Sequence, residues 1–294
     1  MGSYSPDQPP LGHGTLNGGI ENRPEILPPE GGYMPPRQTM RRAKSSWEVA
    51  PATYLLVGIN CLVFLVMAFR GVSLFAPTPD QLMYFGADHA GRVLIYGQWW
   101  RIVSAMFVHV GLIHLATNMW CLWNLGMLAE PLVGSAGLLA AYVLAGAAGN
   151  LLSTMVNWLW FYPDWVKYHD LGVFPGGAGA SGAVFGLAGV LIILLKSPRL
   201  PVPPTELSKL RKSVIYFAAI NLIIGIATLA PGIGVRIDNM AHLGGFGCGL
   251  LFAAPLVPRL GSPRRLFIAR RRLSVSLMTS LLVLFGFFLA QLPG

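Results

Sequence analysis

The chain has 294 residues, of which 54% are hydrophobic and only 11% are charged. Soluble domains carry about 25% charged residues, so this sequence has too little charge to cover a soluble surface. The formal net charge of +9 would suit a nucleic-acid-binding protein only if it lay on one face of a soluble domain, so we expect no nucleic-acid partner. In a membrane protein an excess of Lys and Arg more often records orientation.

Residues 1–48 are predicted to form a disordered cytoplasmic tail. They contain Pro-Pro pairs, many glycines and almost no apolar periodicity, so they cannot bury enough surface to become ordered. The segment lacks the short apolar core and small-residue cleavage site of a secretory signal, and we expect it to remain on the mature chain. Its basic end, between Arg37 and Lys44, is expected to set the membrane orientation rather than to bind lipid or a partner.

Seven apolar segments follow the tail, each close to the roughly 20 residues that cross a bilayer. Their length and uniform apolarity exclude barrel strands, so the sequence predicts an all-α polytopic membrane protein. We expect a core over residues 49–258 and a basic linker with one additional transmembrane helix over 259–294. The segments lie near residues 51–69, 105–128, 136–158, 177–195, 213–230, 239–257 and 274–292.

The basic residues support one orientation of these seven segments. With the tail in the cytoplasm, 16 of the 21 Lys and Arg residues fall on the inside. This skew predicts a cytoplasmic N-terminus and an outer C-terminus. The inside residues are Arg23, Arg37, Arg41, Arg42, Lys44, Lys196, Arg199, Lys209, Arg211, Lys212, Arg259, Arg264, Arg265, Arg270, Arg271 and Arg272, and the outside residues are Arg70, Arg92, Arg101, Lys167 and Arg236.

His114 and Asn118 are polar residues within the second apolar segment. They are four residues apart, so on a helix they share one face. Three interpretations remain open from the residues alone: a contact that holds two helices together, a metal or haem site, and a pair of donors for a developing oxyanion. Metal is disfavoured because no carboxylate or second His pair completes a ligand set, and Cys61, Cys121 and Cys248 have no zinc-site spacing.

Ser181 and His242 lie near the starts of the fourth and sixth segments, each among glycines. A hydroxyl or imidazole in hydrocarbon needs a partner, and a serine with a histidine makes a nucleophile with its base. The glycine spacing also has a purely structural explanation. Gly182 and Gly186, like Gly245 and Gly249, are four apart, which allows two helix backbones to approach closely.

Two better-known glycine motifs do not fit this stretch. No strand precedes it and no Gly-Lys-Ser/Thr follows it, which disfavours a phosphate-binding loop. The order Gly179-Ala180-Ser181-Gly182 also lacks the glycine two residues after serine that soluble hydrolases use.

Taken together, these motifs resemble the rhomboid family of intramembrane serine proteases, over about residues 97–251. The motifs are Gly179-Ala180-Ser181-Gly182, His114 and Asn118 with His109 before them, Ala241-His242 with Gly245 and Gly249, Trp100-Arg101, and Glu130 with Gly134-Ser135.

The resemblance implies a rhomboid-like six-helix core, with the C-terminal segment as an appended seventh helix. It implies that Ser181 is the nucleophile, that His242 is the general base without an acidic third member, and that His114, Asn118 and the Ser181 backbone N–H form the oxyanion hole. The loop over residues 70–104, with Trp99, Trp100 and Arg101, resembles the family's interfacial loop. Phe185 departs from the Tyr of some members, and its ring cannot donate a hydrogen bond to His242.

The expected function is endopeptidase cleavage of other membrane proteins within or beside their transmembrane helices, through an acyl-enzyme. The expected partners are transmembrane substrates and the lipid bilayer, and no cofactor or metal is expected. Family analogy and the lack of an organelle-type presequence favour a bacterial inner membrane. Two other classes stay open: a transporter or channel, and an inactive rhomboid-like scaffold that only binds membrane helices.

Overall fold

The computed structural model describes residues 46–168, 176–228, 230, 236–259 and 261–292. The predicted tail and its basic residues lie outside the described residues, except for its last three positions. Residues Lys44–Gly294 form one compact unit, and the description below concerns this unit alone.

Each of the seven predicted segments overlaps one of the main helices. Shorter elements occupy the loop before α6 and the helix ends. The main helices are α2 (Pro51–Phe69), α6 (Leu112–Val133), α7 (Ser135–Tyr168), α8 (Ser181–Leu194), α9 (Pro204–Ala227), α10 (Asn239–Ala253) and α11 (Arg264–Leu289). The shorter elements are α1 (Ser46–Val49), α3 (Pro79–Tyr84), α4 (Ala90–Leu94), α5 (Arg101–Ser104), the 3-10 helices η1 (Ala105–Phe107) and η3 (Ala254–Arg259), and the strands β1 (Asp88–His89) and β2 (Gly176–Gly177).

The number of helices that can span a membrane is smaller than the seven predicted. In the described part of the chain, five helices are long and apolar enough to cross, and a sixth span arises if α5–η1 and α6, bent by 94°, count as one. The helix α8 has 14 residues, about 21 Å at about 1.5 Å per residue, against a hydrocarbon core of about 30 Å. A helix this short does not cross the hydrocarbon core by itself.

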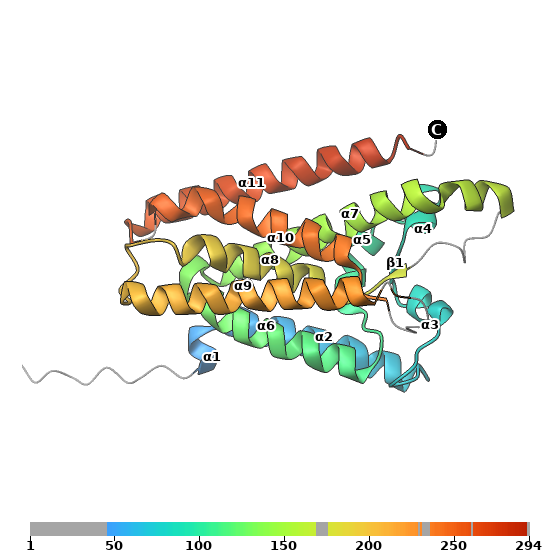
Figure 1. Cartoon of the computed structure of the whole chain (residues 1–294), viewed down its shortest axis with the longest axis horizontal. Coiled ribbons are helices and arrows are strands. Elements are labelled where there is room, and N and C mark those ends of the chain that lie inside the picture. The colour runs from blue at the N-terminus through green and yellow to red at the C-terminus, as the bar shows by residue number, and fades with distance from the viewer. Residues whose placement is uncertain (1–45, 169–175, 229, 231–235, 260, 293–294) are drawn as a thin grey trace, which may run out of the picture. The chain divides into compact units, whose positions relative to one another are not determined.

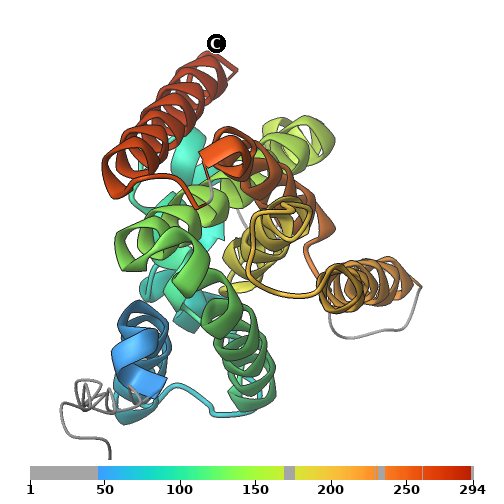
Figure 2. The same ribbon diagram turned by 90° about the vertical axis from the view of Figure 1, so that its left-hand side faces the viewer.

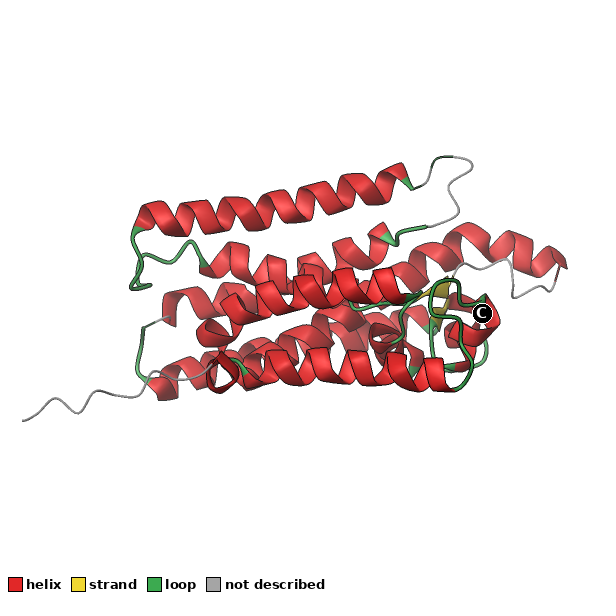
Figure 3. Cartoon of the chain, turned by 90° about the horizontal axis from the view of Figure 1, so that it is seen from below, coloured by secondary structure: helices red, strands yellow, loops and turns green. Residues whose placement is uncertain are grey.

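The helix α8 lies in the interior of the bundle, and most of its residues are buried. The main helices run alongside one another (Figures 1 and 3), and α3, α4, α5 and β1 are gathered at one end (Figure 1). Viewed toward the opposite end, α9 and α11 lie at the periphery (Figure 2). Only 11% of the apolar stretch of α9 and 17% of that of α11 is buried, so both helices present most of their apolar surface to lipid.

Glycines allow α8 and α10 to pack backbone against backbone, as their spacing predicts. A Cβ added at Gly245 or Gly249 would come closer than 3.0 Å to the carbonyl oxygen of Gly182 or Gly186, respectively. Two helix backbones can come this close only where the residues have no side chain. This is the packing geometry of small-xxx-small helix pairs. The start of α8 is therefore held tightly against the start of α10.

Glu130 joins the start of α2 to the end of α6. Its carboxylate is buried and accepts hydrogen bonds from the backbone N–H groups of Ala52 and Thr53, at 2.9 and 2.8 Å, and from the Thr53 hydroxyl at 2.8 Å. The first N–H groups of a helix lack internal partners and carry partial positive charge, so a carboxylate there is stabilised. This contact anchors α6, which carries His114 and Asn118 at its other end.

Candidate active site

Ser181 is the first residue of α8 and is only partly buried. The N–H groups of a first helical turn have no partner within the helix, and they point toward the serine end. A developing negative charge at this position is favoured by these N–H groups and by the helix dipole. The end of α8 therefore provides both a hydroxyl and an anion-stabilising environment.

His242 lies in the first turn of α10, and Asp238 fixes the start of that helix. The Asp238 carboxylate accepts a hydrogen bond from Ala241 N–H at 2.9 Å, and the Asp238 carbonyl accepts one from His242 N–H at 3.2 Å. The imidazole is buried and stacks flat on Phe185, with ring centroids 4.1 Å apart and an interplanar angle of 9°. Its Nδ1 has no hydrogen-bond partner among the described residues, so no acidic third member orients it there.

The structure brings the starts of the helices that carry Ser181 and His242 together. A Cβ added at Gly182 would lie 3.2 Å from the Ala241 carbonyl oxygen, so the residues that adjoin the serine and the histidine touch. Phe185 is four residues after Ser181 and shares its helix face, so the ring that stacks on His242 lies one turn from the serine. No hydrogen bond between the Ser181 and His242 side chains is present in the described structure. Such bonds are often long in enzymes without substrate.

His114 lies against the loop that leads into Ser181. A Cβ at Gly179 would be 2.6 Å from the His114 ring, and Gly179 has a φ of +125°, which disfavours other residues. His114 Nδ1 accepts a hydrogen bond from Val110 N–H at 3.3 Å. Asn118 uses one N–H of its side-chain amide to donate to the His114 carbonyl at 2.9 Å, and the second N–H of the same amide remains available as a donor.

His109 has a contact that the sequence did not reveal. Its Nε2 accepts a hydrogen bond from Ala180 N–H at 3.4 Å, which places the ring proton on Nδ1 and lets it donate to the Phe107 carbonyl at 3.3 Å. The fully buried imidazole thereby ties the loop before Ser181 to the segment before α6. The position of His109 close before His114 in the sequence could have marked it as a site residue. The sequence does not reveal that its hydrogen-bond partner is Ala180.

Arg101 organises the loop that precedes α6. Its guanidinium donates to the carbonyls of Met83 and Ala87, at 2.8 and 2.9 Å, and to the Gln98 side chain at 2.7 Å. The neighbouring Trp100 is half-exposed, as an amphipathic ring at the headgroup level would be. The arginine fixes the fold of this loop and the tryptophan remains at its surface.

The metal interpretation of His114 finds no support in the described part of the chain. No group of three or more His, Cys, Asp or Glu side chains is placed there to hold a metal ion. Cys61, Cys121 and Cys248 are free thiols, within or beside the packed core.

Comparison with known proteins identifies a matching family and several relatives. A family model described as Rhomboid domain matches residues 96–259, a range that contains Ser181, His242, His114 and Asn118. The chain is 32% identical to Rhomboid protease GluP of Bacillus subtilis (strain 168) over 242 residues, which cover 82% of this chain and 41% of that protein. It is 29% identical to Rhomboid protease AarA of Providencia stuartii over 262 residues, which cover 84% of this chain and 86% of that protein. The aligned region thus spans less than half of the Bacillus protein and most of the Providencia protein.

Proposed function

Because the chain belongs to the rhomboid family of intramembrane proteases, we propose that it is a serine endopeptidase that cleaves transmembrane segments of other membrane proteins. Ser181 is the nucleophile and His242 is the general base. The observation that carries this assignment is the stacking of His242 on Phe185, one helical turn from Ser181, where α8 and α10 are in backbone contact.

In the first step Ser181 Oγ attacks the scissile carbonyl carbon while His242 accepts the hydroxyl proton. The carbonyl oxygen becomes an oxyanion, and collapse of the tetrahedral intermediate breaks the C–N bond. His242 gives its proton to the leaving amine, and an acyl ester on Ser181 remains. Water then attacks the ester, again with His242 as base, and releases the carboxylic acid and the free serine.

The oxyanion is stabilised by the Ser181 backbone N–H at the start of α8, together with His114 and Asn118. The helix dipole acts on the same charge. His114 already lies beside the loop before Ser181, and His109 holds that loop through Ala180. Asn118 completes the set with the second N–H of its amide, while the first stays bonded to the His114 carbonyl.

The substrate helix reaches Ser181 from the lipid and must unwind locally before its peptide bond is exposed. The helix α9 is the least buried of the spanning helices and contacts α8 through Phe217, whose ring centroid is 5.9 Å from that of Phe185. A loosely packed helix loses the fewest contacts when it moves. The substrate helix therefore enters on the side of the bundle that α9 covers. Small or helix-weakening residues at the cleaved bond favour unwinding.

The protein is a multi-pass membrane protein. We place its N-terminus in the cytoplasm from the distribution of Lys and Arg, and the membrane as a bacterial inner membrane from family analogy. The proposed domains are the tail over 1–48, the protease core over 49–258 and the linker with the additional helix over 259–294. In this orientation Ser181 and His242 lie toward the outer side, where water enters from outside.

A fluorophosphonate probe tests the nucleophile directly, because it reacts with activated serine hydroxyls. We expect the purified protein to be labelled at Ser181, as located by peptide mass spectrometry, and labelling to be lost in Ser181→Ala and His242→Ala. Ser213→Ala, which removes an exposed hydroxyl on α9, is the matched control and should label like wild type. Labelling that persists in Ser181→Ala would contradict the assignment, and absent labelling of the folded wild type would favour a helix-binding scaffold.

A further inference from the structure

A cavity of about 840 Å³ lies at the end of the bundle opposite Ser181. It is bounded by the end of α6, the end of α8, the first turns of α9 and the first turns of α11. The cavity is separated from Ser181 by the 14 residues of α8, about 21 Å of helix. Nothing in the proposed peptide cleavage uses this space.

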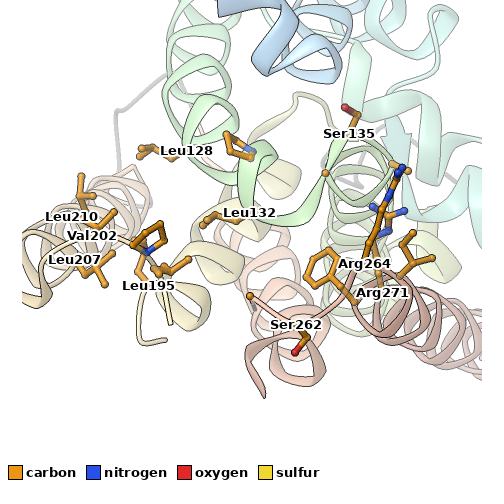
Figure 4. A pocket seen from close by; sticks show the side chains of 18 residues that line it. Leu128, Leu132, Ser135, Leu195, Val202, Leu207, Leu210, Ser262, Arg264 and Arg271 are labelled. Atoms are coloured by element: carbon orange, nitrogen blue, oxygen red, sulfur yellow. The ribbon is translucent and has the colours of Figure 1, made fainter. Parts of the chain in front are cut away.

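The walls of the cavity divide into an apolar part and a basic part. Leu195, Leu207 and Leu210 form one side, and the side chains of Arg264 and Arg271 lie at the other (Figure 4). None of the lining residues is acidic. A ligand that fits both parts has an apolar chain and an anionic group.

The two arginines retain capacity to bind an anion. Arg271 is half-buried and donates one hydrogen bond from Nη1 to the Val133 carbonyl at 3.0 Å, which holds the guanidinium at the cavity and leaves its other donors available. Arg264 is exposed and makes no hydrogen bond or ion pair with a described residue. A guanidinium group can donate two parallel hydrogen bonds to a phosphate, so both arginines suit a phosphate ligand.

The position of the cavity in the bundle indicates which ligand it meets. Leu207 and Leu210 belong to α9, Arg264 and Arg271 belong to α11, and these two helices have the largest lipid-facing surfaces. The first turns of α11 are strongly basic, with Arg265, Arg270 and Arg272 beside the two cavity arginines. Basic pockets between transmembrane helices, at an end of the bundle that is rich in arginine, bind anionic lipid headgroups.

We propose that this cavity is a binding site for one anionic phospholipid. An acyl chain fills the leucine-lined part between α6, α8 and α9, and the phosphate accepts hydrogen bonds from Arg264 and Arg271. Bound there, the lipid links α11 to the protease core and does not touch the peptide-cleaving residues.

Native mass spectrometry of the full chain in detergent tests this site without any protease assay. We expect one dioleoylphosphatidylglycerol molecule to be retained in preference to dioleoylphosphatidylcholine. Its dissociation constant should rise about fivefold in Arg264→Gln and more in Arg264→Gln/Arg271→Gln. The matched control Arg265→Gln/Arg272→Gln removes the same charge as the double variant from the same helix, and it should retain the lipid like wild type because neither side chain lines the cavity.

Three results would overturn the proposal. Equal retention of the phosphatidylcholine lipid would show an apolar groove without anion selectivity, equal loss in the control pair would show a general effect of charge, and competition by inorganic phosphate alone would show a free-anion site. Because Arg271 also bonds to Val133, its variant can fail to fold. Arg264→Gln removes no described bond, so lipid retention in this variant tests the basic part of the cavity. Ala136→Phe narrows the cavity at an exposed position without changing charge, so reduced retention there tests whether the lipid occupies the cavity.

Discussion

Phe185 is the side chain that orients the proposed base, because its ring lies flat against His242. We predict that Phe185→Ala lowers kcat by on the order of 10²-fold through misplacement of the imidazole, with a smaller change in KM. Phe185→Tyr keeps the ring and should retain most activity. Phe217→Ala is the control, because Phe217 packs against Phe185 from α9, and it should lose much less. Equal losses in the Phe185→Ala and Phe217→Ala variants would mean that core packing, rather than imidazole orientation, limits the rate.

Asn118 is expected to act on the oxyanion and not on folding. We predict that Asn118→Ala lowers kcat by about 10²–10³-fold while the thermal unfolding midpoint stays near that of wild type. Asn124 on the same helix makes the same type of bond, from its amide to the carbonyl four residues earlier, at 2.7 Å. The kcat of Asn124→Ala should match that of wild type. A comparable loss of kcat in Asn124→Ala would contradict a specific role of Asn118 at the oxyanion.

At the scale of elements, the contact of α8 with α10 depends on the absence of side chains. Gly249→Ala puts a methyl group against the Gly186 carbonyl, so we predict a lower unfolding midpoint and loss of cleavage. Gly247 lies on the same helix with nothing within 4 Å of an added Cβ. Gly247→Ala should therefore leave activity unchanged and raise stability slightly, since Ala favours the helix over Gly by about 1 kcal/mol. If both variants unfold alike, the contact does not determine stability.

The short β1–β2 pair carries a buried carboxyl outside the spanning helices. Burial raises the pKa of Asp88 to about 7, against the effect of a hydrogen bond from Thr154, and the nearby Asp238 carboxylate adds to the rise. An unfolded aspartate loses its proton near pH 3.9. Between about pH 4 and about pH 7 the folded state holds a proton that the unfolded state has lost, so the free energy of unfolding falls as pH rises through this range.

Asp88→Asn tests this dependence, because the amide stays neutral and its oxygen still accepts the Thr154 hydrogen bond. We predict that the wild-type unfolding midpoint decreases from about pH 4 to about pH 7 and that the variant shows a flatter profile over the same range. Identical profiles for both proteins would assign the pH dependence to another group. Asp238 and Arg101 are the charged side chains whose fields reach Asp88.

The sequence predicted the elements better than their ends, and the errors have physical causes. Hydropathy located α9 at 213–230 and α11 at 274–292, but the helices begin at Pro204 and Arg264, because charged first turns continue a helix into the interface. The predicted start of the Ser181 helix at 177 was early, since Gly176 and Gly177 pair with β1. The segment at 105–128 proved to be η1 and α6, separated by a sharp bend.

The candidate site was predictable where residue spacing decides the geometry. Glycines four apart indicated that α8 and α10 approach closely, and the structure confirms this contact. Spacing does not report the orientation of a ring or an amide. The stacking of Phe185 on His242, the hydrogen bond from Ala180 to His109 and the turn of Asn118 toward His114 therefore required the folded chain.

At the scale of the whole molecule, the proposed orientation can be measured by labelling single cysteines from one side. In a background without the three native cysteines, Ser73→Cys lies in the loop after α2 and Pro198→Cys in the loop after α8, and both positions are exposed. We predict that a membrane-impermeant maleimide added to intact spheroplasts modifies position 73 and reaches position 198 only after lysis. The reverse pattern would invert the orientation and place the proposed site on the inner side.

The most direct test of the central claim is cleavage of a transmembrane substrate in liposomes by the purified full chain, compared with Ser181→Ala. The substrate carries small residues near the outer end of its helix. The account predicts cleavage by wild type and loss of nearly all turnover in Ser181→Ala and in His242→Ala, with all three proteins equally folded. Cleavage that persists in folded Ser181→Ala would contradict a mechanism in which this serine is the nucleophile.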